Sequence, residues 1–106
     1  MRILIDECVN PRLRFAFTDF EVQTVAHAGW GGLLDGPLVA KARLVIDVLV
    51  TIDKGFEFQQ NLAKLKFGIV IVHVHRNTMN CYRPLFAELV YAVQRVKPGE
   101  VVHVGT

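Results

Sequence analysis

Short apolar runs along the chain predict the strands of a buried sheet. The runs at 2–5 and 47–53 are apolar or β-branched and do not alternate with polar residues, a pattern typical of strands covered on both faces, and residues 68–74 predict a further strand. Residues 21–25 alternate and predict a more exposed strand, and residues 101–104 predict a last one. We therefore expect five strands, with 2–5 and 47–53 at the centre of the sheet.

Segments with the residue spacing of helices lie between these predicted strands. Asn10 and Pro11 supply an N-cap and a first helical residue for a short helix. Further helices are predicted at about 38–44 and 56–65. The clearest helix runs from Tyr82 to Val93, where apolar residues follow the i, i+3, i+4, i+7 spacing of an amphipathic helix.

The order of these elements predicts the fold class. Strands and helices alternate with short connections, which favours an α/β fold of three layers, α/β/α, with a mostly parallel central sheet. A length of 106 residues predicts a single domain, 1–106. Hydrophobic residues make up 52% of the chain and charged residues 21%, a composition that supports a core and excludes a disordered chain.

Composition also bears on location and partners. The longest apolar runs are far shorter than the roughly 18 to 20 residues of a membrane span. The opening MRILIDE lacks the apolar stretch of a signal peptide, so we expect a cytoplasmic protein. A net charge of +2 permits an anionic partner such as RNA. Because the mean hydropathy, +0.33, is high, we expect apolar surface that pairs with another copy in a homodimer.

Acidic residues follow two of the predicted central strands. Asp6 and Glu7 end the first, and Asp53 ends the run at 47–53. The carboxyl ends of parallel strands meet at one edge of a sheet, and ligands bind there where the strand order reverses. Asp35, at the start of the second helix, adds another carboxylate. Such a set of oxygen donors suits Mg²⁺ or Mn²⁺.

Each acid also has a simpler interpretation. Asp35 precedes Gly36 and Pro37 and is a good helix N-cap. Asp6 and Asp53 could cap a following loop or helix, and Glu7 could face solvent. Taken together, the acids favour a shared cation site, because clustered carboxylates repel one another unless a proton or a cation lies between them.

Other candidate residues surround this cluster in the sequence. Trp30 could stack on a base or fill the core, in a loop without the glycine pattern of a nucleotide-binding site. His73 and His75 form an H-x-H pair better suited to a strand rim or substrate contact than to a metal site. Cys8 and Cys81 show no CxxC spacing, and we expect two buried thiols. The candidate substrate-binding residues, basic, amide or aromatic, are Arg12, Lys54, Gln59, Gln60, Asn61 and Trp30.

The segments MRILIDE, AGWGGLLDGPLVAKA and VLVTIDKGFEFQQNL together resemble the small PIN-like family of bacterial proteins, relatives of PIN-domain toxins that are often encoded beside a short antitoxin. The resemblance implies a PIN-like fold and a divalent-metal-dependent ribonuclease, the toxin component of a toxin-antitoxin pair. It makes Asp6, Asp35 and Asp53 catalytic, metal-binding acids, with Glu7 as a secondary ligand. Many PIN domains have a further acid where this chain has Gly55. Single-stranded RNA is the expected substrate, because a crevice at a sheet edge admits a splayed strand more readily than a stiff duplex.

Two rival functions remain open on the sequence alone. A phospho-receiver domain also has acids after its first strand and an Asp after a later one, but its Thr or Ser after the fourth strand and Lys after the fifth are missing here, where Thr78 is a poor positional match. A catalytically degenerate PIN-like module would keep the fold and bind a protein partner without turnover. Gly55 is the feature that favours it.

Overall fold

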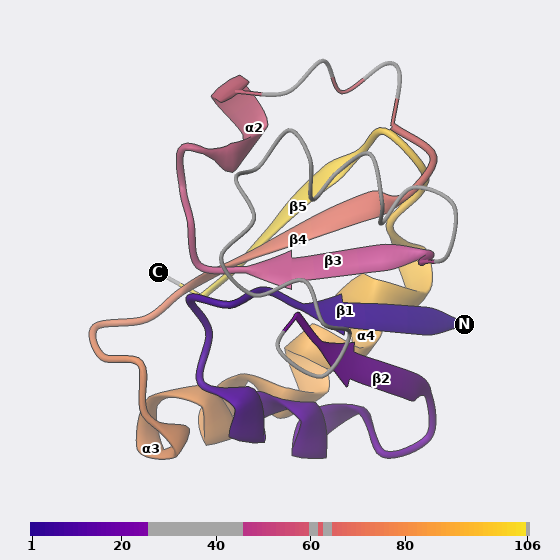
Figure 1. The fold of residues 1–106 in the computed structure, drawn as a ribbon. Helices are drawn as coiled ribbons and strands as arrows, with labels where there is room; N and C mark the ends of the chain where they lie inside the picture. Colours follow the sequence, from indigo (N-terminus) through magenta and orange to yellow (C-terminus); the bar gives the residue numbers. More distant parts are fainter. Residues whose placement is uncertain (26–45, 60–61, 63–64, 106) are drawn as a thin grey trace.

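Five parallel strands form the frame of the protein. The structure, a computed structural model, describes residues 1–25, 46–59, 62 and 65–105, without the side chains of Glu57 and Gln59. The strands lie in the order β2-β1-β3-β4-β5, and every neighbouring pair is parallel, as predicted (Figure 1). Their bounds are β1 Arg2–Ile5, β2 Glu21–Thr24, β3 Val48–Thr51, β4 Gly68–His73 and β5 Val101–Gly105.

The predicted strands agree closely with the observed ones because their apolar runs are buried on both faces. Residues of β3 and the first five of β4 are all buried, whereas β2, at the edge, is mostly accessible. Side chains from alternate positions divide into two clusters, one on each face of the sheet. The continuous burial of β1, β3 and β4 explains why their sequences do not alternate.

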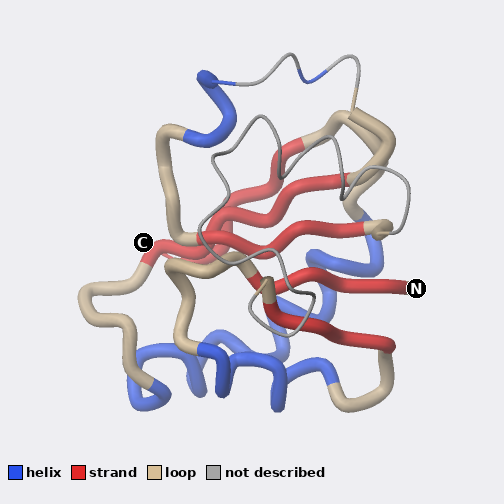
Figure 2. Tube along the Cα trace, viewed as in Figure 1, coloured by secondary structure: helices blue, strands red, loops and turns tan. Residues whose placement is uncertain are grey.

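One face is covered by helices drawn from two parts of the chain. The 3₁₀ helix η1 (Pro11–Phe17) packs Leu13 and Phe17 into the cluster of that face, together with Leu89 and Val93 of α4. The Asn10 side chain accepts a hydrogen bond from the Arg12 N–H at 3.0 Å, which confirms the predicted N-cap. On the other side of the sheet lies α2 (Phe56–Gln59), whose Phe56 is fully buried (Figure 2).

The helix predicted from Tyr82 to Val93 is divided in the structure. It comprises α3 (Met79–Tyr82), the 3₁₀ turn η3 (Arg83–Leu85) and α4 (Phe86–Arg95). Pro84 explains the division, because proline lacks the N–H for an α-helical hydrogen bond and its ring clashes with the carbonyl four residues earlier. The apolar spacing continues across the break, which is why the pattern alone predicts a single helix.

Three further predictions lie partly or wholly outside the described residues. The helix predicted at about 38–44 and the loop that holds Trp30 are both outside them. Of the helix predicted at 56–65, the structure describes helical residues over Phe56–Gln59, and Leu62 in a single 3₁₀ position. In the part of the chain that is described, no helix is long and apolar enough to cross a membrane.

Candidate functional site

The strand order fixes where a ligand would bind. From β1 the chain crosses to β2 on one side, and from β2 it crosses back to β3 on the other side of β1, so the strand order reverses between β1 and β3. In open α/β sheets, ligands bind outside the carboxyl ends of the strands at such a point. Asp6 directly follows β1, and Asp53 lies two residues beyond the end of β3. The predicted position of both acids is confirmed.

Asp6 is the most constrained polar group at this edge. Asp6 is 9% exposed. Its backbone N–H donates to the Val50 carbonyl at 2.9 Å, which extends the pairing of β1 with β3 by one residue. One carboxylate oxygen accepts the Glu7 N–H at 2.7 Å. The other accepts the Thr51 hydroxyl at 2.7 Å and the Cys8 thiol at 3.6 Å. These bonds fix the orientation of the carboxylate before any ligand arrives.

Thr51 joins the two acids. Its side chain is fully buried at the end of β3, and its Oγ donates to Asp6 Oδ2 while accepting the Asp53 N–H at 3.0 Å. One hydroxyl thus connects the segment after β1 with the segment after β3, 45 residues away. The sequence contains the signal for this residue, a threonine that ends an otherwise apolar strand, but its contact with Asp6 depends on which strands are neighbours.

Asp53 is held by its own loop. Its Oδ1 accepts the Gly55 N–H at 2.9 Å, and its carbonyl accepts the Phe56 N–H at 3.2 Å where α2 begins. This arrangement is an Asx turn, so the loop-capping interpretation of Asp53 holds alongside its place at the switch point. In the described part of the chain, no hydrogen bond reaches its Oδ2. Gly55, which stands where many PIN domains have an acid, belongs to the turn that orients this carboxylate.

The prediction that both cysteines are buried thiols is wrong. Cys8 is exposed and Cys81 is partly accessible. Cys8 follows Asp6 closely in a turn that leads to the molecular surface, and its Sγ lies 3.5 Å from Thr51 Oγ. Partial burial of the thiol raises the pKa of Cys8, and the negative charge of Asp6 adds to the increase. Cys8 is therefore a thiol at neutral pH and a weak nucleophile.

Asn77, in the loop after β4, forms hydrogen bonds with the loop after β1. Its side-chain amide donates to the Cys8 carbonyl at 2.9 Å, and its Oδ1 accepts the Asn10 N–H at 2.7 Å. The Tyr82 hydroxyl donates a short hydrogen bond to the same Oδ1. Tyr82 is fully buried, and this burial raises its pKa to about 12. Nothing in the sequence pattern singles out Asn77, because Asn10 and Cys8, which it joins to this loop, lie 67 and 69 residues earlier in the chain.

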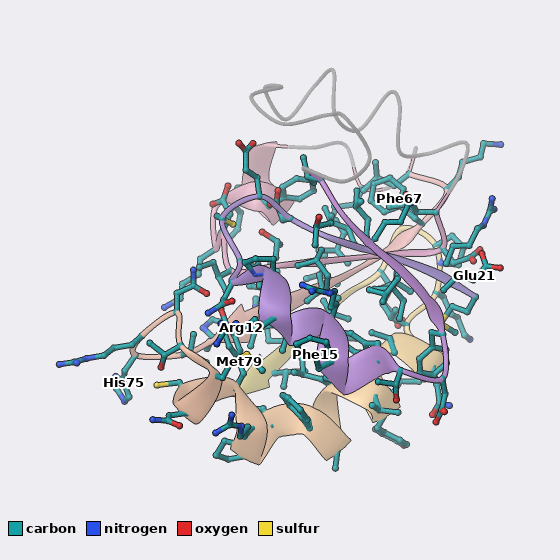
Figure 3. All side chains as sticks on the ribbon, turned by 60° about the horizontal axis from the view of Figure 1, so that its bottom comes forward. Arg12, Phe15, Glu21, Phe67, His75 and Met79 are labelled. Atoms are coloured by element: carbon teal, nitrogen blue, oxygen red, sulfur yellow. The ribbon has the colours of Figure 1, made fainter. Side chains whose placement is uncertain are left out.

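The two histidines of the H-x-H pair do not act together. His73, at the end of β4, faces His103 of β5, with Nε2 and Nδ1 2.7 Å apart and the ring centroids 5.0 Å apart. His75 is exposed in the loop beyond β4 and extends away from the body of the protein (Figure 3). The register of β4 with β5 sets His73 opposite Gly105 and His103 opposite Ile71, so the two histidines are diagonal neighbours, which the sequence does not reveal.

The remaining predicted site residues are divided between the described part of the chain and the rest. Arg12, at the start of η1, and Lys54, beside Asp53, are exposed (Figure 3 shows Arg12). Glu7 is exposed and contributes its backbone N–H to Asp6. The predicted residues that lie outside the described residues or side chains are Asp35, Trp30, Gln59, Gln60 and Asn61.

A divalent cation needs several oxygen donors that meet at one point. Among residues 1–25, 46–59, 62 and 65–105, no group of three His, Cys, Asp or Glu side chains is arranged to hold a metal ion. Fewer than three described acids meet at any one point, and the two that follow the central strands β1 and β3 are Asp6 and Asp53. Mg²⁺ is commonly held by one or two carboxylates, with water and substrate phosphate filling the other positions, so this pair fits that mode of binding.

Comparison with known proteins gives no match: no family model, no curated protein and no solved structure is similar enough to place this chain.

Proposed function

We propose that the chain is a divalent-metal-dependent ribonuclease that hydrolyses RNA phosphodiesters at the switch point between β1 and β3. The observation that carries the proposal is the link from Asp6 through Thr51 to Asp53. A pair of carboxylates positioned in advance at the end of a buried sheet is costly for a fold unless a cation or a proton balances it. In a metal-dependent nuclease, the bound cation balances the charge of the acids. The PIN-like, three-layer fold expected from the sequence also implies metal-binding acids at these positions.

In this proposal Asp6 and Asp53 hold Mg²⁺ or Mn²⁺, and Asp35 completes the set. A bound divalent ion lowers the pKa of a coordinated water and neutralises charge on phosphoryl oxygens. The chain's own contribution is positional. Thr51 and the Glu7 N–H hold the Asp6 carboxylate in one orientation, and the Gly55 N–H holds Asp53. Neither acid then needs to reorganise when the ion and substrate arrive.

Exposed cations near the acids provide the proposed contact with RNA. Arg12 at the start of η1 and Lys54 in the loop after β3 are accessible to solvent, and neither forms an ion pair with the described acids. Such residues attract the phosphate backbone without reading its sequence. A small antitoxin that covers the same edge would block the substrate, and this is the partner we propose.

The test is a Mn²⁺ titration by calorimetry, with RNA cleavage assayed on the same samples. Asp53→Asn should lose both metal binding and cleavage, because the amide keeps the shape of the side chain and removes its charge. Asp19→Asn is the matched control, since Asp19 is exposed in the turn after η1 and makes the same change in net charge. A folded wild type that binds no metal would refute the proposal.

The two rivals predict different results from the same samples. The degenerate module predicts a folded protein that neither binds metal at Asp53 nor cleaves RNA. A receiver would take up a phosphoryl group at Asp53, and the strand order β2-β1-β3-β4-β5 is compatible with that class. However, Thr78 does not directly follow β4: it lies five residues beyond His73, the last residue of that strand, and is the N-cap of α3. We therefore keep the nuclease as the proposed function.

A further inference from the structure

Two histidines near the carboxyl ends of β4 and β5 form a pair that the proposed nuclease site does not use. His73 Nε2 and His103 Nδ1 lie 2.7 Å apart, and the two ring centroids are 5.0 Å apart. His73 is partly accessible and His103 is exposed, so solvent reaches the pair. The acids of the proposed site follow β1 and β3, whereas these histidines belong to β4 and β5, on the side of β3 that faces away from β1.

The sheet places both rings on the same face. Side chains alternate between the two faces along a strand. Ile71, two residues before His73, belongs to the cluster on the face that α2 covers, and Val101, two residues before His103, packs against the same cluster. His73 and His103 therefore point to one face, from neighbouring strands that lie about 4.8 Å apart in a sheet. The paired backbones hold the two rings side by side.

The facing nitrogens are the atoms with which imidazole binds metal ions. Neutral imidazole has one nitrogen with an available lone pair, and either Nδ1 or Nε2 can be that nitrogen. In the pair as it stands, one ring donates its proton to the other in a hydrogen bond. A dication in place of that proton would accept a lone pair from each ring, with the single proton of each ring on its other nitrogen.

The separation of the nitrogens indicates which ions fit. With metal–nitrogen bonds of about 2.0–2.1 Å, two nitrogens lie about 2.9 Å apart at a right angle and about 3.3 Å apart at the tetrahedral angle. The observed 2.7 Å is closer to the right-angle value. Ligands at right angles are typical of Ni²⁺ and Cu²⁺, and tetrahedral ligands are typical of Zn²⁺. A small opening of the rings therefore admits Ni²⁺ or Cu²⁺, whereas Mg²⁺ prefers oxygen donors.

We propose that His73 and His103 form a two-nitrogen site for a transition-metal dication of tetragonal geometry, Ni²⁺ or Cu²⁺, with water in the remaining positions. A site with two protein ligands agrees with the finding that no three His, Cys, Asp or Glu residues in the described part of the chain form a metal-holding group. Because the strands hold the second nitrogen beside the first, it captures an ion that the other ring has already bound, which raises the affinity above that of a single exposed histidine.

The test is a Ni²⁺ titration by calorimetry at neutral pH, with excess Mg²⁺ present to occupy oxygen donors. Wild type should bind one Ni²⁺. His73→Gln and His103→Gln should each weaken binding at least about ten-fold, because a single imidazole of the pair remains. Ni²⁺ should also raise the Tm of wild type and not that of His103→Gln, since an ion that binds only the folded state stabilises it. Nuclear magnetic resonance of the imidazole groups should show that paramagnetic Ni²⁺ broadens the signals of these two rings first.

Controls separate this site from other metal ligands of the chain. His75→Gln removes an exposed histidine in the loop beyond β4, outside the pair, and should leave Ni²⁺ binding unchanged. Asp53→Asn should also keep Ni²⁺ binding, whatever its effect on Mn²⁺, so the result is independent of the proposed nuclease site. Circular dichroism should show that each variant is folded. A folded wild type that binds no Ni²⁺, or His73→Gln and His103→Gln variants that bind it as tightly as wild type, would overturn the proposal.

Discussion

Replacing Thr51 with valine tests whether its hydroxyl holds the two acids in place. Valine keeps the shape and the β-branched character of threonine, so the strand and core are preserved and the hydroxyl alone is lost. The bond to the Asp6 carboxylate involves a charged group and contributes about 1.5–3 kcal/mol, and the bond from the Asp53 N–H adds about 1 kcal/mol or less because that group is only partly buried. We expect Thr51→Val to lower the free energy of unfolding by about 2–4 kcal/mol.

The measurement is thermal and urea unfolding followed by circular dichroism. For a domain of this size a loss of 1 kcal/mol lowers Tm by about 4–8 °C, so the valine variant should melt at least about 8 °C below wild type. Thr51→Ser is the matched control: it keeps the hydroxyl, removes one buried methyl group and should cost only about 1 kcal/mol. If the valine variant is as stable as the serine variant, Thr51 contributes shape only and the argument for positioned acids fails. Metal affinity should follow the same order: the Thr51→Ser variant should keep its affinity, and the Thr51→Val variant should bind more weakly.

Two further predictions follow from perturbed groups near the site. Burial raises the pKa of Tyr82 to about 12 from 10, so its contribution to stability should be complete below about pH 10 and decline as the pH rises toward 12; urea unfolding across that range should show a decline that Tyr82→Phe largely removes. Cys8 is exposed but has a raised pKa, so in a Cys81→Ser background it should react slowly with iodoacetamide at pH 7 and faster with each step toward high pH; fast reaction at neutral pH would contradict the environment described here.

The centre of the sheet could be predicted from sequence because burial on both faces leaves a direct mark on residue type. After the exposed Arg2, the first run is apolar and buried (Ile3–Ile5), as is the core of the second (Val48–Val50), and the acids that follow show where each run ends. The carboxyl ends of parallel strands lie at the same edge of a sheet. Asp6 and Asp53 are therefore expected at one edge, on neighbouring strands if the two runs are adjacent in the sheet.

The contacts that shape the site could not be predicted, because they depend on which strands are neighbours and in what register. The Asn77 bonds to the loop after β1 and the pairing of His73 with His103 join residues that nothing links in the sequence. The predicted burial of Cys8 is wrong for a related reason. Free cysteine is usually buried, but Cys8 follows the end of a strand, where the chain turns toward solvent. Pro84 is a sequence signal for the break in the helix, but the apolar spacing on either side of it favours one continuous helix.

The bond between Asp6 and Thr51 joins two segments that are 45 residues apart, and this separation has a consequence for how the site is assembled. Closing so long a segment of chain costs entropy that is repaid only when β1 and β3 pair, so the acids come together in the same event that forms the centre of the sheet. An incompletely folded chain therefore holds the two carboxylates far apart and has no assembled site. Under the function proposed above, nascent and misfolded copies would not cut RNA.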